Sequence, residues 1–167
     1  MTPYTQFAQD HKHLSRDDFL AKVGVPHILV TEKQAVRDEE AGFMTVKFTK
    51  EVLSESAEAQ TFVLPVRKRP DANAFAMMVT LGRAPNNDLV LDHQKVSKFH
   101  AYFNETGSDW FITDGNSSNG TFVNGERLKP GDRTPIGDNT DLSFSQFLSY
   151  RFVLPGSMYE HIQSLKS

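Results

Sequence analysis

From Phe75 onward the chain alternates short runs of β-branched and aromatic residues with turn residues, and no helical period separates the runs. Such spacing is typical of an antiparallel β-sandwich, because each strand turns back on its neighbour without a crossover helix. Asn124-Gly125 supports this prediction, since both central residues of a type I′ hairpin need a positive φ. The expected strands are Met77–Leu81, Asp88–Leu91, His100–Asn104, Trp110–Thr113, Thr121–Val123, Glu126–Leu128, Leu142–Phe144 and Tyr150–Leu154.

Helical signals are clear near the two ends of the chain. Ser15 is a suitable N-cap for a short helix that runs to Val23, and residues 1–14 have no clear pattern and are expected to be irregular. A second short helix is expected over Met158–Leu165, and the three remaining strands at His27–Val30, Gly42–Phe48 and Thr61–Val66. The predicted fold is therefore all-β, an antiparallel sandwich with a short N-terminal helix and a short C-terminal helix.

Composition excludes several classes of function. The 167 residues contain no cysteine, which excludes disulfides, zinc–cysteine sites and thiol catalysis. A net charge of -3 argues against binding nucleic acid through bulk electrostatics. There is no apolar run of membrane-spanning length and no signal-like N-terminus, so a cytoplasmic protein without a membrane partner is expected. His11 and His13 lack a third ligand, and neither a metal nor another cofactor is predicted.

Three short stretches, each next to a predicted strand end, carry most of the polar chemistry. They are Gly82-Arg83, Ser97-Lys98-Phe99-His100 and Asn116 to Thr121. They supply a guanidinium, an ammonium, hydroxyls and a carboxamide, all of which can donate hydrogen bonds to an oxyanion. None of these groups is an obvious nucleophile or proton-transfer base. Because loops at one end of a sandwich lie side by side, the stretches predict a site that binds a phosphate group rather than cleaving one.

These stretches, with their neighbours, resemble the forkhead-associated (FHA) domain, a SMAD-like β-sandwich that recognises phosphothreonine in peptides. The resemblance covers roughly residues 62–154. It divides the chain into an N-terminal segment (1–26), a strand-containing extension (27–60) that either belongs to the sandwich or extends it, the FHA domain (62–154) and a C-terminal tail (155–167). The matching segments are Gly82-Arg83, Asn87 to Leu91, Val96 to Ala101, Trp110 to Asp114, Asn116 to Gly125 and Leu142-Ser143-Phe144.

The resemblance implies a role for each site residue. Arg83 and Ser97 would hold the phosphate or the adjacent peptide, and Lys98 would add a further phosphate contact. Ser118 would lie near the phosphothreonine, and Asn119 would hydrogen-bond the peptide main chain. The remaining residues would support the site by shaping or bracing the loops: Gly82, His100, Gly120, Asn124 and Gly125.

The function that follows from this resemblance is non-enzymatic recognition of phosphothreonine peptides in cytoplasmic signalling, downstream of a Ser/Thr kinase. Two alternatives belong to other classes. A hydrolase is one, since Ser97, His100 and Asp114 can imitate a catalytic triad on paper. A phospho-independent scaffold is the other, using the sandwich face or residues 1–60. The partner, the kinase, the flanking-sequence preference and the oligomeric state are not specified by these patterns.

Overall fold

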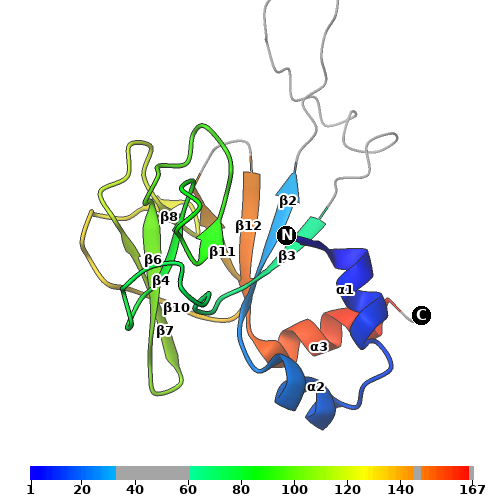
Figure 1. Ribbon diagram of the computed structural model, residues 1–167. Coiled ribbons are helices and arrows are strands. Elements are labelled where there is room, and N and C mark those ends of the chain that lie inside the picture. Colours follow the sequence, from blue (N-terminus) through cyan, green and yellow to red (C-terminus); the bar gives the residue numbers. More distant parts are fainter. Residues whose placement is uncertain (33–60, 145–147, 166–167) are drawn as a thin grey trace, which may run out of the picture.

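Two β-sheets pack face to face in the computed structural model, which describes residues 1–32, 61–144 and 148–165 (Figure 1). The larger sheet has the strand order β1-β3-β2-β12-β11-β8-β9, and the smaller sheet has the order β10-β7-β6-β4-β5. The strands are β1 (Thr2–Pro3), β2 (His27–Glu32), β3 (Thr61–Pro65), β4 (Val79–Gly82), β5 (Leu89–Val90), β6 (Ala101–Thr106), β7 (Asp109–Asp114), β8 (Phe122–Val123), β9 (Glu126–Arg127), β10 (Thr134–Ile136), β11 (Thr140–Ser143) and β12 (Leu148–Val153).

The sandwich architecture predicted from the sequence is confirmed, with one local difference. All strand pairs are antiparallel except β4 and β5, which run parallel through Leu81↔Leu89 and Gly82↔Val90. The main core lies between the sheets and includes Phe103 and Ile112 of the smaller sheet and Phe152 of the larger one, all fully buried. The Phe103 and Phe152 rings are stacked with centroids 6.2 Å apart, so this pair joins the two layers.

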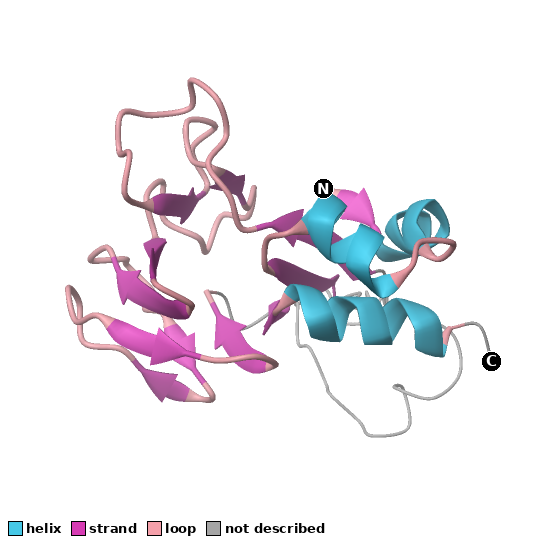
Figure 2. Ribbon diagram, turned by 90° about the horizontal axis from the view of Figure 1, so that it is seen from below, coloured by secondary structure: helices cyan, strands magenta, loops and turns pink. Residues whose placement is uncertain are grey.

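A second core covers the outer face of the larger sheet. The helices α1 (Tyr4–His11), α2 (Arg16–Val23) and α3 (Pro155–Ser164) gather on this side of the molecule (Figure 2). Because side chains alternate along a strand, Phe152 points into the main core, whereas its neighbour Val153 packs with Phe7 and Phe19 of the helices. Phe19 is therefore a core residue of the chain.

The structure confirms some local predictions and corrects others. Ser15 caps α2 by accepting a hydrogen bond from the Asp18 backbone N–H at 3.2 Å, as predicted. Residues 1–14 were expected to be irregular, which is wrong for α1: this helix has no side-chain cap, and it is stabilised by burying Phe7 and Ala8. The C-terminal helix begins at Pro155 rather than at Met158, because proline is well tolerated in the first helical turn.

Residues near the N-terminus also contribute to the larger sheet. Strand β2 lies between β3 and β12 and pairs with both along its length.

The structure also contains β10, for which no strand was predicted. The predicted strand Gly42–Phe48 lies outside the described residues. No helix in the described part of the chain is long and apolar enough to cross a membrane.

Candidate functional site

Sheet register brings the three polar stretches to one end of the smaller sheet. Leu81, near the end of β4, pairs with Ala101 at the start of β6, and Ala101 also pairs with Asp114 at the end of β7. Three loop segments therefore adjoin the same end of the smaller sheet: residues 82–88, 91–100 and 115–121. We call these three segments the loop cluster.

Backbone and side-chain hydrogen bonds hold the loop cluster together. The Arg83 N–H donates to the Ser97 carbonyl at 2.9 Å, and the Ser118 N–H donates to the Ser97 hydroxyl at 3.0 Å. The Asn119 carboxamide donates to the Lys95 carbonyl at 2.7 Å. Ser97 thus lies between the other two stretches, and the predicted residues Arg83, Ser97, Ser118 and Asn119 form one connected group.

The cationic side chains of the cluster have donors available for a ligand. Arg83 is half-buried, and its Nε donates to the Val96 carbonyl at 3.1 Å. This bond orients the guanidinium, whose terminal NH₂ groups bond no described residue. Lys98 is exposed, and its ammonium has no hydrogen-bond or ion-pair partner among the described side chains and backbone groups. An oriented guanidinium beside a mobile ammonium is a suitable arrangement for an anion with several oxygens.

His100 connects two loops and is fully buried. Its Nδ1 accepts from the Ser97 N–H at 3.0 Å, so the proton lies on Nε2, which donates to the Gly120 carbonyl at 3.0 Å. Burial lowers the pKa of His100, although the Gly120 carbonyl and Asp114 act in the opposite direction. Both ring nitrogens are engaged by backbone groups, so this imidazole has no nitrogen available to serve as a base for the Ser97 hydroxyl.

The glycines of the site permit close approach of neighbouring groups. A Cβ on Gly82 would lie 2.3 Å from the Lys98 carbonyl oxygen and 2.9 Å from the Asn87 carboxamide nitrogen. Gly120 has a φ of +84°. Asn124 and Gly125 have φ values of +49° and +84°, as a type I′ hairpin requires. The Asn124 side chain accepts from the Asp141 N–H, which holds the turn of this hairpin to β11, and the Leu128 N–H beyond the turn donates to the Thr121 carbonyl of the loop cluster at 2.8 Å.

Asp114 shapes the third stretch, a role that the sequence reasoning missed. Its buried carboxylate accepts from the Ser117 hydroxyl at 2.6 Å, the Ser117 N–H at 3.1 Å and the Thr121 hydroxyl at 2.7 Å. Burial alone would raise the pKa of Asp114, but the hydrogen bonds from Ser117 and Thr121 hold it below its usual value. The signal was present in the sequence, since Asp114-Gly115-Asn116-Ser117 is typical of a side-chain-stabilised turn.

Asn87 and Arg127 also belong to the site and were not predicted. The buried Asn87 carboxamide donates to the carbonyls of Ala84 and Lys98, at 2.9 and 2.6 Å, and so fixes the first loop to the second. Arg127 of β9 lies over Gly120, where an added Cβ would be 2.7 Å from its Nε. Its guanidinium adds a positive charge beside the loop that carries Ser118 and Asn119.

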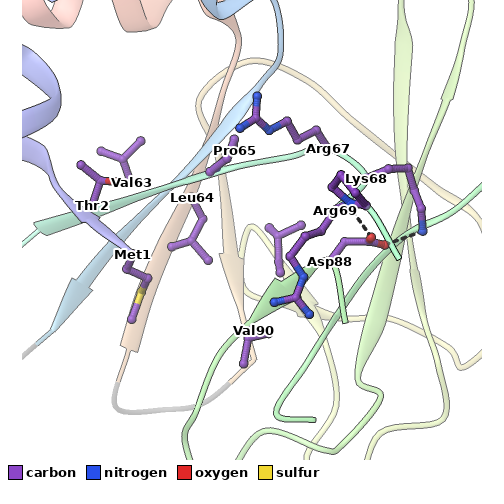
Figure 3. A pocket seen from close by; sticks show the side chains of 12 residues that line it. Met1, Thr2, Val63, Leu64, Pro65, Arg67, Lys68, Arg69, Asp88 and Val90 are labelled. Carbon is purple, nitrogen blue, oxygen red and sulfur yellow. Dashed lines mark hydrogen bonds and ion pairs between the residues drawn. The ribbon is translucent and has the colours of Figure 1, made fainter. Parts of the chain in front are cut away.

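A cavity of about 550 Å³ lies elsewhere, between the strands β1 and β3 and the strand β5 (Figure 3). Arg67 and Arg69 line it, and none of the predicted site residues does. Within the described residues, no group of three or more His, Asp or Glu side chains is arranged to hold a metal ion.

Together, these observations define a β-sandwich with a cluster of hydrogen-bonded polar loops at one end. Comparison with protein families makes the assignment specific: residues 79–145 match the FHA domain. The chain therefore contains an FHA domain, which is a phosphopeptide-binding module.

Similar proteins match over different parts of their length. The transcriptional regulatory protein EmbR of Mycobacterium tuberculosis is 28% identical over 115 residues, which cover 69% of this chain and 29% of EmbR. The oxoglutarate dehydrogenase inhibitor of Corynebacterium glutamicum is 33% identical over 93 residues, which cover 50% of this chain and 65% of the inhibitor. The structure of full-length yeast Pml1p matches with a TM-score of 0.52 at 14% identity, covering 84% of this chain and 93% of Pml1p, and shows the same fold.

Proposed function

We propose that this chain is a non-enzymatic reader of phosphothreonine, acting on cytoplasmic proteins phosphorylated by a Ser/Thr kinase. The observation that carries the proposal is the loop cluster itself. It places Arg83, Ser97 and Asn119 in one hydrogen-bonded group at the end of an FHA domain.

Each group has a role that follows from its chemistry. The Arg83 guanidinium, held through its Nε, pairs with two phosphate oxygens, and Lys98 supplies a second positive charge. The hydroxyls of Ser97 and Ser118 donate to the phosphate or to the peptide beside it. Asn119 uses its carboxamide oxygen and second N–H for the peptide main chain.

The supporting residues keep these groups in position. His100 links the second and third loops, and Gly82 allows the first two loops to pack closely. Gly120 has a positive φ near the end of the third loop, and Asn124-Gly125 forms the turn of the hairpin that follows this loop. Because the His100 ring nitrogens both bond backbone groups, the geometry favours binding over hydrolysis.

The expected affinity follows from the number of contacts. A phosphothreonine carries about -1.5 to -2 charges at pH 7. Hydrogen bonds to a charged group contribute about 1.5–3 kcal/mol each. Two or three such bonds, less the entropy lost when a flexible peptide is ordered, correspond to micromolar dissociation constants.

Calorimetric titration of the chain with a phosphothreonine peptide and its unphosphorylated twin tests the proposal. We expect binding only to the phosphorylated peptide, and Arg83→Ala to weaken it by about 100-fold, which corresponds to the loss of about 3 kcal/mol. Arg151→Ala is the matched control, because Arg151 pairs with Asp141 in the other sheet. Equal binding of the two peptides, or an unchanged affinity in Arg83→Ala, contradicts the proposal.

A further inference from the structure

Beside the loop cluster, residues 70–78 form a loop that a buried polar network holds in place. At its centre the Asn73 carboxamide accepts from the Lys68 ammonium at 2.9 Å and donates to the Thr80 hydroxyl at 3.1 Å. The Asp88 carboxylate, whose side chain is fully buried, accepts from the same ammonium at 2.7 Å and from the Thr80 N–H at 2.8 Å. Lys68 is therefore part of the anchor that holds this loop.

The anchored loop exposes large apolar side chains. Phe75 is 53% exposed and Met77 is 82% exposed. The Met77 carbonyl accepts from the Asn104 carboxamide at 2.6 Å, and the Phe75 N–H donates to the Asn73 side chain at 3.1 Å. Because these bonds fix the backbone at both residues, neither side chain can turn toward the core without breaking them. Large apolar groups held in water in this way mark an interaction surface.

These side chains continue an aromatic row that reaches the loop cluster. The Phe75 and Phe99 ring centroids are 6.3 Å apart, and the Phe99 and Tyr102 rings are stacked at 6.2 Å. Phe99 is 37% exposed and directly follows Lys98. Its ring lies over Gly115, where an added Cβ would be 2.5 Å from the Phe99 Cε1. The row, defined as Phe75, Phe99 and Tyr102 with Met77 beside it, thus adjoins two of the three loops.

The size of this surface indicates its occupant. Aromatic side chains present roughly 150–250 Å² each, so the exposed fractions leave an apolar surface on the order of 300 Å². A stable complex between two folded proteins buries about 800 Å² on each partner. The row is therefore too small to hold a second copy of this chain by itself, and it has the size of one or two peptide side chains.

The short distance between the loop cluster and the row also indicates a peptide side chain as the occupant. Neighbouring Cα atoms are about 3.8 Å apart, so the Phe99 backbone lies one residue from the Lys98 backbone. An extended peptide advances about 3.3 Å per residue. A side chain two to four residues from a phosphothreonine bound at the loop cluster therefore reaches the row.

We propose that the aromatic row is a specificity subsite for a large apolar side chain, carried by the phosphothreonine peptide a few residues from its phosphate. This inference rests on the proposed function. It defines the ligand class more narrowly, as phosphothreonine segments with a nearby leucine, methionine or aromatic residue.

The test uses nine-residue phosphothreonine peptides with serine at all other positions, in which one leucine is moved through each position. We expect one or two leucine positions to improve binding to the wild-type chain about tenfold over the all-serine peptide. In Phe75→Ser/Met77→Ser this ratio falls to about one, while the all-serine phosphopeptide binds unchanged. Leu165→Ser is the matched control, because Leu165 is 59% exposed at the end of α3, and it retains the tenfold ratio.

The other outcomes separate the two proposals. If no leucine position changes the affinity by more than twofold while binding still requires the phosphate, the subsite is refuted and the proposed function stands. If binding ignores the phosphate, both fail. A wild-type dimer that Phe75→Ser/Met77→Ser converts to a monomer in analytical ultracentrifugation assigns the row to self-association and also overturns the inference.

Discussion

Replacing Asp114 by Asn tests whether this carboxylate organises the loop that carries Ser118 and Asn119. The Asn side chain keeps one acceptor for the hydroxyls of Ser117 and Thr121, but without the negative charge. Its NH₂ group then faces the Ser117 N–H, so two donors oppose each other where a hydrogen bond of 3.1 Å existed. We therefore expect a loss of both stability and loop order.

The magnitude follows from the three hydrogen bonds. An unsatisfied buried donor costs about 1–3 kcal/mol, and each of two charge-assisted bonds weakens by about 1 kcal/mol. The free energy of unfolding should therefore fall by about 3–5 kcal/mol, measured as a shift of the urea midpoint at constant slope. The affinity for a phosphothreonine peptide should fall with it, because the bond that orients the Ser117 hydroxyl, which accepts from the Gly120 N–H, is weakened.

A matched control and a second variant make the Asp114 result specific. Asp109→Asn, at the exposed start of the same strand, should change the free energy of unfolding by less than about 0.5 kcal/mol. Thr121→Val removes one bond to Asp114, so the double variant should lose about 1 kcal/mol less than the sum of the single losses. A loss under about 1 kcal/mol in Asp114→Asn, with unchanged peptide affinity, would refute the assigned role.

Two further predictions concern buried groups. Burial lowers the pKa of His27 from 6.5 to about 4, so the neutral ring contributes its full stability above pH 6.5. About 3 kcal/mol of the free energy of unfolding is lost as the pH falls from 6.5 to 4. Urea melts should show this loss in the wild type and not in His27→Gln, and parallel pH profiles of the two proteins would contradict it. Gly82→Ala should lower the free energy of unfolding by about 2–3 kcal/mol, since the added Cβ meets the Lys98 carbonyl. Gly137→Ala is the control and should be near neutral, because its Cβ meets nothing within 4 Å. Equal shifts of the melting temperature in the two variants would disprove the steric reasoning.

The strands and the site loops were readable from sequence because their signals are local. Turn residues such as Asn124-Gly125 mark the hairpin directly, and alternating apolar residues mark the strands around them. Helix α1 could not be read in this way, since its formation depends on burying Phe7 against a sheet from distant parts of the chain. The parallel contact of β4 with β5 is likewise a matter of tertiary pairing.

The site residues likewise differ in whether their sequence signal is local or depends on tertiary contacts. Arg83 and Asn119 stand out because each is a polar residue next to a glycine and near a predicted strand end, and Ser97 because it opens a polar stretch before the next predicted strand. Asn87 acts through a buried hydrogen bond to Lys98, in the next loop along the chain, which a sequence pattern does not show. Asp114 bonds its near neighbours Ser117 and Thr121, so its role was open to prediction from the local turn pattern and was missed. The aromatic row was also hidden, because Phe75 and Phe99 become neighbours only when the loop at residues 70–78 is anchored by Asp88.

The central claim is that the loop cluster recognises phosphothreonine, and one measurement tests it most directly. A single peptide is titrated in three forms, carrying phosphothreonine, phosphoserine or threonine at the same position. The account predicts no detectable binding of the threonine form and a preference of about fourfold for phosphothreonine over phosphoserine, since burying one methyl group contributes about 0.8 kcal/mol. Equal affinities for the phosphothreonine and threonine forms would contradict it.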